Sequence, residues 1–254
     1  MKDVQVVKVG GAALNDPQWL DQFAQQAHTK TRRVIVHGGG PEVSGLSMRL
    51  GVDVTWNGGR RVTSAAALDV AAMVLTGRIN KRIVRALGRV GVDAIGLSGE
   101  DGRLLTAGIA QQGALGLVGE IAAVRVPVLE ALLGAGFVPV ISPISSGPDG
   151  CALNVNADEV ATAVATAVGA QELLFLTDVP AVRDQAGARA ELSTDEARAL
   201  ITDQVATGGM AVKLSAALLA VEAGVARVRV GPLEMLNDAT AGTLIRREEA
   251  LACP

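Results

Sequence analysis

The sequence predicts an α/β protein whose mostly parallel sheet is covered by helices on both faces. Short β-branched runs alternate along the chain with longer segments rich in Ala and Leu, which is typical of this class. The runs are almost continuously apolar, as expected of strands that are buried on both faces. With 254 residues, of which 49% are hydrophobic and 19% charged, the chain can bury a sizeable core, and intrinsic disorder is excluded.

The order of the elements follows from these runs and from the turn residues between them. The predicted strands cover residues 4–9, 33–37, 93–97, 138–142, 172–177 and 226–230. The predicted helices cover residues 17–29, 41–50, 64–89, 127–133, 157–168, 196–205 and 210–223. Residues 53–63 and 103–126 have no helical period and are predicted to form hairpins or flaps. A shift in composition near residues 149–152 predicts two lobes of one domain, at about residues 1–150 and 151–254.

The composition excludes several classes of protein. A net charge of −3 and an aromatic content of 2% argue against a nucleic-acid-binding surface. Two cysteines, Cys151 and Cys253, cannot form a disulfide framework and fit a reducing compartment. No signal peptide is visible, and the apolar residues 131–148 contain Gly, Pro and Ser at turn spacing, which is unlike a membrane span. We therefore expect a cytoplasmic protein.

The first strand carries a lysine and ends in two glycines, Lys8-Val9-Gly10-Gly11. A lysine in a buried strand is costly unless its ammonium group meets an anion. Glycines at the carboxyl end of a strand let backbone N–H groups approach a ligand, and this edge of an open α/β sheet is where ligands bind. An edge-strand lysine that extends into water, followed by an ordinary turn, explains the same residues equally well.

The second predicted strand has the same layout and ends in His37-Gly38-Gly39-Gly40-Pro41. Three glycines before a helix N-terminus supply unhindered N–H groups that suit an oxyanion or a phosphate. The alternative is a flexible connector. For His37, a structural role is favoured over acid–base catalysis, and no zinc site is indicated around it.

Two further motifs lie at the starts of helices in the second lobe. In Asn154-Val155-Asn156-Ala157-Asp158, the amides and the carboxylate could bind a polar substrate and hold lysines in place, or they could simply cap the helix. Thr207-Gly208-Gly209 precedes a helix whose Lys213 lies near the first turn. A cation there is unfavourable against the helix dipole unless an anion is close, although a plain surface lysine is common.

The first flap contains Arg60-Arg61-Val62-Thr63. An arginine fork suits bidentate binding of a carboxylate. For Arg60 we favour the simpler interpretation of a charge in contact with solvent.

In this order, the motifs resemble those of the amino acid kinase family, and within it the branch that phosphorylates N-acetyl-L-glutamate. The resemblance extends over essentially the whole chain and includes Thr177-Asp178-Val179. It implies a three-layer αβα sandwich around a mainly parallel central sheet. The N-lobe would bind the acyl amino acid and contact a neighbouring subunit, and the C-lobe would bind ATP. The implied reaction converts ATP and N-acetyl-L-glutamate to ADP and N-acetyl-L-glutamyl 5-phosphate, the second step of arginine synthesis by the acetylated route.

The resemblance also implies roles for individual residues. Lys8 and Lys213 would neutralise the migrating phosphoryl group, and Asp158 would orient both lysines. The N–H groups of Gly10, Gly11 and Gly39 would bind phosphoryl oxygens. The residues expected to hold the substrate are Gly39, Gly40, Arg61, Asn154 and Asn156, with Arg61 on the α-carboxylate. Those expected around ATP are Gly10, Gly11, Asp178, Val179, Arg183, Val205, Ala206 and Thr207. Mg²⁺ would arrive with ATP and be held mainly by its phosphates, without metal ligands from the protein.

The flap departs from the family pattern, which reads Asn-Gly-Leu-Arg-Val-Thr followed by an acidic residue. Here Arg60 takes the place of the leucine, Asn57 is displaced by one position, and Ser64 follows Thr63. An additional arginine could meet an acidic protein surface, so a kinase for aminoadipate attached to an acidic carrier protein is the close alternative. A catalytically silent sensor of nucleotide or amino acid is another alternative, but it would have no need for paired cations facing a phosphoryl group.

Family members that arginine inhibits carry an additional helix before the first strand. Here the first strand is predicted within a few residues of Met1, so we expect a homodimer that is insensitive to arginine. The stretch 65–75, rich in Ala, Val, Leu and Met, could form a symmetric contact, or it could be a helix that faces only its own core.

Overall fold

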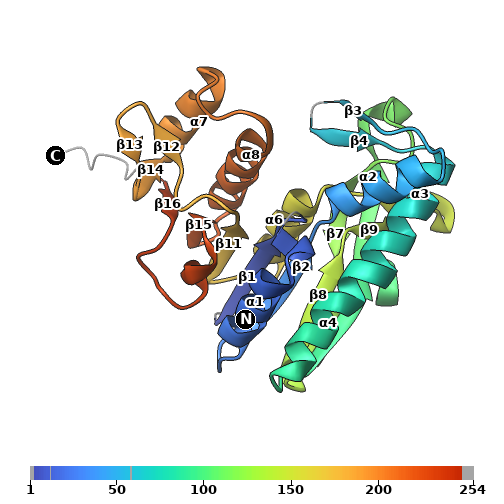
Figure 1. Ribbon diagram of the computed structural model, residues 1–254, viewed down its shortest axis with the longest axis horizontal. Helices are drawn as coiled ribbons and strands as arrows, with labels where there is room; N and C mark the ends of the chain where they lie inside the picture. Colours follow the sequence, from blue (N-terminus) through green and yellow to red (C-terminus); the bar gives the residue numbers. More distant parts are fainter. Residues whose placement is uncertain (1–2, 12, 58, 248–254) are drawn as a thin grey trace.

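An eight-stranded sheet runs through the middle of the molecule in the order β14-β16-β15-β11-β1-β2-β8-β5 (Figure 1). The computed structural model describes residues 3–11, 13–57 and 59–247. Six strands of the sheet are parallel and coincide with the six predicted strands, while the pair β14 and β16 joins through an antiparallel contact between β15 and β16. The strands are β1 (Val4–Val9), β2 (Arg32–His37), β5 (Ala94–Ser98), β8 (Val138–Ser142), β11 (Glu172–Leu176), β14 (Glu191–Ser193), β15 (Arg227–Gly231) and β16 (Thr243–Arg246).

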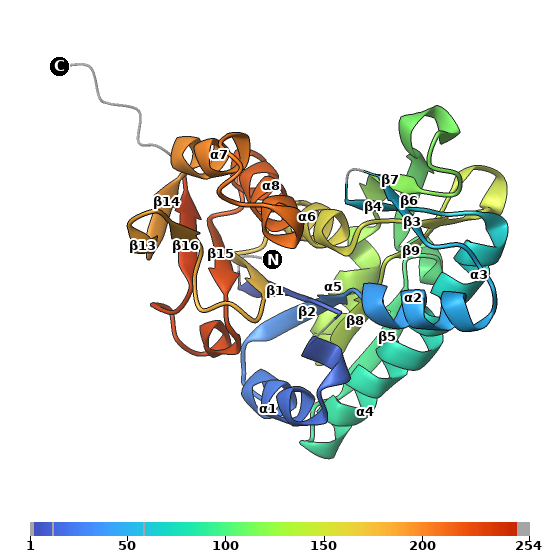
Figure 2. The ribbon, with the colours of Figure 1, turned by 45° about the horizontal axis from the view of Figure 1, so that its top comes forward.

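Helices cover both faces of this sheet, which confirms the predicted sandwich of three layers (Figure 2). On one face lie α1 (Pro17–Ala27), α2 (Gly40–Arg49), α3 (Ala65–Ala72) and α4 (Asn80–Arg89); on the other lie α5 (Val126–Gly134), α6 (Ala157–Ala167), α7 (Thr194–Thr202) and α8 (Gly208–Glu222). Side chains alternate between two cores: Val4 and Val6 pack toward α6 and α8, whereas Val7 and Val9 pack toward α1 to α4. Lys8 therefore points toward α6 and α8, and His37 toward α4.

The predicted helix 64–89 is a single helical stretch with a π-helical segment, Met73–Ile79, between α3 and α4. The hydroxyl groups of Thr76 and Ser142 are 2.9 Å apart, which ties this segment to the end of β8. Segments of π-helix are frequent at functional sites, and this one lies against the glycine loop that follows β2.

Both segments predicted as hairpins contain antiparallel strands. The first flap is the hairpin of β3 (Thr55–Asn57) and β4 (Arg60–Val62). The second segment contains the pair β6 (Leu105–Ile109) and β7 (Gly119–Val124), which joins β9 (Ile144–Ser146) and β10 (Ala152–Asn154) in a four-stranded sheet. A further hairpin is formed by β12 (Arg183–Asp184) and β13 (Gly187–Ala188). Short 3₁₀ segments cover Ala13–Asn15, Asp101–Arg103, Ala110–Gly113, Pro148–Gly150 and Leu233–Leu236.

Several other expectations bear on this architecture. Among the residues that the structure describes, no helix has the length and apolar character needed to cross a membrane. Cys151 is a half-buried free thiol, and Cys253 lies outside the described residues. Within the stretch 65–75, Val70 and Val74 are buried in the chain's own core, while Met73 is 55% exposed. The lobe boundary near residue 150 stays a prediction.

Candidate active site

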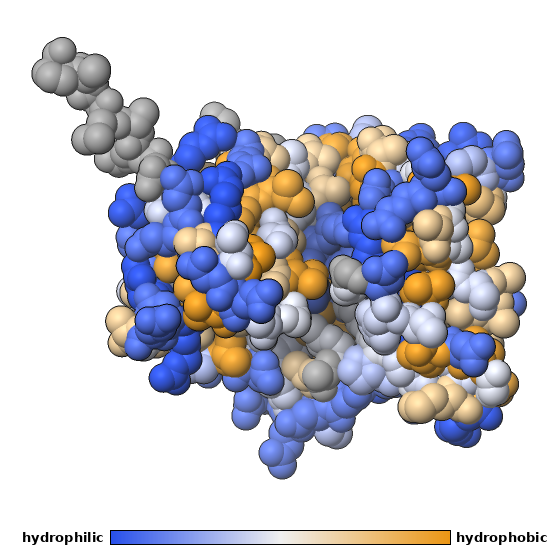
Figure 3. Space-filling view, turned by 90° about the horizontal axis from the view of Figure 1, so that it is seen from above, coloured by the Kyte–Doolittle hydropathy of each residue, from blue (hydrophilic) through white to orange (hydrophobic). Residues whose placement is uncertain are grey.

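A cavity of about 980 Å³ opens between the two halves of the molecule, at the carboxyl ends of the parallel strands. Figure 3 shows the hollow from above, between the flap on one side and α8 on the other. Its walls come from both glycine loops, the flap, the start of α6 and the start of α8. The charged and polar residues among them are Lys8, Arg60, Arg61, Asn154, Asn156, Asp158, Glu159 and Lys213.

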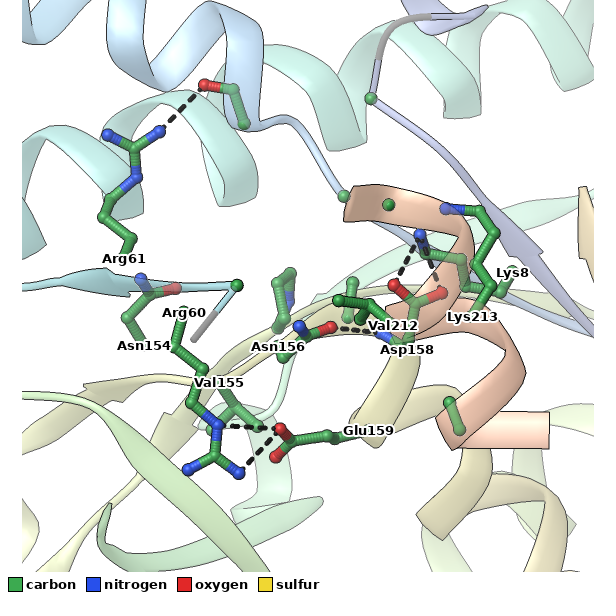
Figure 4. A pocket seen from close by; sticks show the side chains of 18 of the residues that line it. Lys8, Arg60, Arg61, Asn154, Val155, Asn156, Asp158, Glu159, Val212 and Lys213 are labelled. Carbon is green, nitrogen blue, oxygen red and sulfur yellow. Dashed lines mark hydrogen bonds and ion pairs between the residues drawn. The ribbon is translucent and has the colours of Figure 1, made fainter. Parts of the chain in front are cut away.

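Lys8 and Asp158 form a buried ion pair at one end of this cavity (Figure 4). The Nζ atom of Lys8 is 3.0 Å from Oδ1 and 3.1 Å from Oδ2 of Asp158. Lys8 lies near the carboxyl end of β1. Asp158 lies in the first turn of α6, where its negative charge also interacts favourably with the helix dipole. The costly buried lysine is thus compensated by an acid from a segment 150 residues away.

Lys213 lies on α8 beside this pair and lines the same cavity. Burial and the positive charge of Lys8 lower the pKa of the Lys213 ammonium below its ordinary value, while Asp158 and Asp178 act in the opposite direction. Within the part of the chain that the structure describes, Lys213 forms no ion pair. Asp158 is therefore paired with Lys8, and the ammonium group of Lys213 leaves positive charge in the site that suits an anion.

The two glycine loops touch each other beside the lysines. A Cβ atom on Gly11 would lie 2.7 Å from the Cα atom of Gly39, and one on Gly39 would lie 2.3 Å from the Cδ1 atom of Ile79. A larger residue does not fit at either position. At Gly11 the backbone of Gly39 occupies the space, and at Gly39 the side chains of Leu75 and Ile79 in the π-helical segment occupy it. The loop after β2 is further held by a hydrogen bond from the Gly38 N–H to the Val9 carbonyl, at 3.0 Å.

Arg61 occupies the other end of the cavity. Its side chain is buried and donates from Nη2 to the carbonyl of Gly40 at 3.0 Å and to the hydroxyl of Ser44 at 2.6 Å. The guanidinium also stacks on Trp56, 4.5 Å from the ring centroid. Its Nη1 atom is buried and has no hydrogen-bond partner among the described residues. Burial lowers the pKa of this guanidinium, and Arg61 forms no ion pair within the part of the chain that the structure describes.

Asn154 and Asn156 lie between these two ends, Asn154 as the last residue of β10 and Asn156 directly before α6. The Asn154 amide donates to the hydroxyl of Thr63 at 3.2 Å, and that hydroxyl in turn donates to the carbonyl of Arg61 at 2.7 Å. Asn156 caps α6, because its side-chain oxygen accepts from the Asp158 N–H at 2.8 Å. The capping interpretation is therefore correct for Asn156, whose side chain also lines the cavity.

The expectation for Arg60 was wrong. Arg60 is half-buried and forms ion pairs with Glu159 at 2.8 Å and with Glu120 at 2.6 Å. These carboxylates raise the pKa of Arg60 above its ordinary value, although burial opposes them. At the neighbouring flap position, Gly59 has a φ of +77°, and a Cβ there would lie 2.9 Å from Val212 of α8. Arg60 therefore fastens the flap to the start of α6 and to β7.

The residues expected around ATP in the C-lobe lie beyond the cavity walls. Asp178 and Val179 follow β11, Arg183 begins β12, and Val205, Ala206 and Thr207 precede α8. None of these six lines the cavity, whereas the adjacent Gly208 and Gly209 do. The negative charge of Asp178 nevertheless opposes the lowering of the pKa of Lys213, so the loop after β11 lies near the lysines.

The sequence interpretation did not assign site positions to Trp56, Ser44 and Glu159. The sequence does offer a signal for Trp56, an aromatic residue within a predicted flap in a chain with 2% aromatic residues, and the structure leaves its side chain 54% exposed. Ser44 and Glu159 carry no such signal, because each acts through an arginine that is distant in sequence: 17 residues for Ser44 and 99 for Glu159.

Comparison with known proteins reveals close relatives. The family model described as "Amino acid kinase family" matches residues 3–232. Acetylglutamate kinase from Synechococcus sp. is 41% identical over 94% of this chain and 90% of that protein. Acetylglutamate kinase from Methylobacterium nodulans is 40% identical over 98% of this chain and 90% of that protein.

Solved structures share the fold. The structure of smu.665 from Streptococcus mutans has a TM-score of 0.84 at 29% identity and covers 97% of this chain and 99% of its own. N-acetylglutamate synthase from Neisseria gonorrhoeae, complexed with coenzyme A and N-acetyl-glutamate, has a TM-score of 0.85 at 25% identity over 98% of this chain and 60% of its own. Carbamate kinase from Giardia, at 15% identity and a TM-score of 0.75, shares the fold.

Proposed function

Because this chain belongs to the amino acid kinase family, we propose that it transfers the γ-phosphoryl group of ATP to the side-chain carboxylate of N-acetyl-L-glutamate. The products are ADP and N-acetyl-L-glutamyl 5-phosphate, in the second step of arginine synthesis by the acetylated route. The observation that carries the proposal is the joint placement of Lys8, Asp158 and Lys213 at one end of a cavity whose other end holds Arg61. The names of the relatives support the choice of substrate.

The reaction needs charge compensation more than it needs a base. The γ-carboxylate of the substrate is ionised at pH 7, so one of its oxygens attacks the γ-phosphorus directly while the bond to the bridging oxygen of ADP breaks. The difficulty is to bring two anions together and to spread the charge of the migrating group. Lys8 and Lys213 supply the positive charge, and Asp158 holds Lys8 in place at 3.0 Å. N–H groups of Gly10, Gly11 and Gly39 bind the phosphoryl oxygens.

The acyl amino acid lies between Arg61 and the lysines. Arg61 binds its α-carboxylate, since its buried Nη1 has no hydrogen-bond partner among the described residues and suits a negatively charged ligand. Gly39, Gly40, Asn154 and Asn156 complete the contacts to the substrate.

ATP binds on the C-lobe side of the lysines, along Asp178, Val179, Arg183 and residues 205–207. Mg²⁺ arrives with the nucleotide and is held mainly by the phosphates. Among residues 3–11, 13–57 and 59–247, no group of three or more His, Cys, Asp or Glu could hold a metal ion, and Asp158 is engaged by Lys8. When bound, Mg²⁺ supplies charge neutralisation to the transferred group.

The two lobes are proposed to bind different substrates. Residues up to about 150 provide the flap, Arg61 and the dimer contact, and the later residues bind the nucleotide. The enzyme is proposed to act as a homodimer in the cytoplasm, with the exposed side of α3 and Met73 as the contact.

The alternative substrate, aminoadipate on an acidic carrier protein, depended on Arg60. That guanidinium is already engaged by Glu120 and Glu159, so it is not available to an acidic surface. A coupled assay of ADP release with N-acetylglutamate, free aminoadipate and a carrier-bound aminoadipate tests the choice. We expect turnover with N-acetylglutamate; its absence would overturn the proposal.

The pH dependence should show the lowered pKa of Lys213. Because burial and Lys8 favour the neutral amine, kcat/KM should decline with rising pH earlier than an ordinary lysine would require. Bound ATP, an anion, raises this pKa again, so the decline in kcat should lie at higher pH than the decline in kcat/KM. Steady-state profiles from pH 6 to 10 measure both. A Lys213→Arg variant is the reference, because arginine stays protonated; the same alkaline decline in that variant would contradict the assignment.

Loss of the Arg60 network should weaken substrate binding. An Arg60→Leu variant removes both ion pairs and leaves Glu159 half-buried, so the flap is released from α6. We expect KM for N-acetylglutamate to rise by about 3–10-fold, with KM for ATP little changed, since a partly exposed pair contributes about 1 kcal/mol. Arg49→Leu, which removes an exposed arginine of α2, is the matched control. Equal KM values for the two variants would show that the network does not hold the flap.

A further inference from the structure

His37 is a fully buried titratable residue that the proposed chemistry does not use. It ends β2, immediately before the glycine loop, and its side chain is 0% exposed. Each nitrogen of its ring faces a different kind of partner. Nδ1 lies 3.0 Å from the carbonyl oxygen of Gly38, and Nε2 lies 3.2 Å from Nδ2 of Asn80.

These partners fix the tautomer of the ring. A carbonyl oxygen only accepts hydrogen bonds, so the proton of the neutral ring must be on Nδ1. The Asn80 nitrogen is identified by its other contacts, which are the carbonyl oxygens of Val140 at 2.9 Å and Leu97 at 3.3 Å. It carries two hydrogens, one for the Val140 carbonyl and one for Nε2, which therefore presents its lone pair, while the Leu97 carbonyl is the longest of the three contacts. Burial lowers the pKa of His37 to about 4, which keeps the ring neutral at physiological pH.

Asn80 connects this ring to the sheet. It is 0% exposed and is the first residue of α4, directly after the π-helical segment. Its amide nitrogen donates to the carbonyl group of Val140 in β8 and lies 3.3 Å from that of Leu97 in β5, and its oxygen accepts from Lys81 Nζ at 3.2 Å. A chain of hydrogen bonds therefore leads from β8 through Asn80 and His37 to the Gly38 carbonyl.

The Gly38 carbonyl determines the direction of the next N–H group. The peptide bond between Gly38 and Gly39 is planar and trans, so fixing its oxygen on one side directs the Gly39 N–H to the opposite side. Glycine has no side chain to limit its dihedral angles, so this loop depends on such external contacts for its conformation.

We propose that His37, held by Asn80, is a positioning residue for phosphoryl transfer. Its Nδ1–H fixes the peptide that presents the Gly39 N–H to the phosphoryl oxygens, and it neither takes nor gives a proton in the reaction. This inference rests on the proposed function, since it concerns the same anion-binding loop. A loop misplaced by about 1 Å can lower a rate on the order of 100-fold.

Two substitutions separate the positioning role from a merely structural one. In His37→Asn, the amide nitrogen is bonded to Cγ as Nδ1 is, so it can still donate to the Gly38 carbonyl. In His37→Gln, the polar group lies one bond farther out, where it can meet Asn80 but not Gly38. Both remove the ring. We expect His37→Asn to keep kcat within about threefold of the wild type and His37→Gln to lose about 10- to 100-fold, with KM values for both substrates nearly unchanged. Equal kcat values in the two variants would overturn the proposal.

The tautomer is measured independently by ¹⁵N NMR of the histidine rings. The sequence contains two histidines, so a His28→Gln variant at an exposed position leaves His37 alone. We expect the neutral Nδ1–H form throughout pH 5–8; an Nε2–H form would overturn the proposal. Asn80→Leu serves where His37→Gln does not fold. It removes the donor to Nε2, so we expect a mixture of tautomers together with a lower kcat, and a mixture with unchanged kcat contradicts the positioning role.

The wild-type assay separates this inference from the function on which it rests. If the wild type does not turn over N-acetylglutamate, the proposed function fails. If it does and the two His37 variants are equally active, only the positioning role fails.

Discussion

Lys213→Met is expected to lower kcat by about 10²–10³ without loss of stability. The catalytic loss follows because a preorganised cation facing the transferred group contributes about 3–4 kcal/mol to the transition state. Stability should be unchanged or slightly raised, because the folded protein disfavours the charge of this lysine, as its lowered pKa shows. Methionine has a similar length and fills the same half-buried space. The pair of measurements is kcat and the midpoint of thermal unfolding.

Lys8→Met is the informative partner of that variant. It should lower kcat by a similar factor, but it also leaves the buried carboxylate of Asp158 without its cation. Breaking a buried pair in this way costs about 3–5 kcal/mol, so unfolding should occur at a much lower temperature. Asp158→Asn in the Lys8→Met background is the control, because a neutral amide needs no cation and should restore much of the stability but none of the activity. Equal stability of the two lysine variants would contradict the ion-pair assignment.

The arrangement of two lysines and one acid could be predicted because the place of each residue in its strand or helix is evident from the neighbouring sequence. Lys8 lies in a strand whose period of two places it on one face, Asp158 lies in the first turn of α6, and Lys213 lies near the start of α8. In an open α/β sheet all three positions converge at one edge. The six parallel strands were predictable from their short apolar runs, which are typical of strands covered by helices.

The ion pairs of Arg60 and the strands β14 and β16 could not be predicted from local sequence patterns. The partners of Arg60 are 60 and 99 residues away, so nothing near it in the sequence distinguishes a paired arginine from a solvated one. β14 has three residues and β16 has four, and their pairing depends on contacts at the edge of the sheet rather than on composition. The π-helical segment is likewise set by packing against the loop of Gly39.

Arg229→Met is expected to destabilise the fold by about 3–5 kcal/mol while leaving the active site intact. Arg229 lies in β15, is 3% exposed and pairs with Glu172 at 2.8 Å. Its guanidinium also donates to the carbonyl groups of Met235, Asp238 and Ala241, which fixes the segment between β15 and β16. An apolar side chain of similar size should destabilise the fold here, because three carbonyl groups would lose a donor and the Glu172 carboxylate would lose its buried cation, keeping the amide of Gln5.

Chemical denaturation with Arg246→Met as the matched variant isolates this effect. Arg246 forms an ion pair with Glu191 at 3.2 Å, but both side chains are more than half exposed, so its loss should cost about 0–1 kcal/mol. Both arginines belong to adjacent strands, and neither lines the cavity that holds Lys8 and Arg61. Activity per folded molecule should therefore match the wild type in both variants. A small loss of stability in Arg229→Met would show that the carbonyl groups find water instead, and a loss of kcat would show that the segment after β15 influences the site.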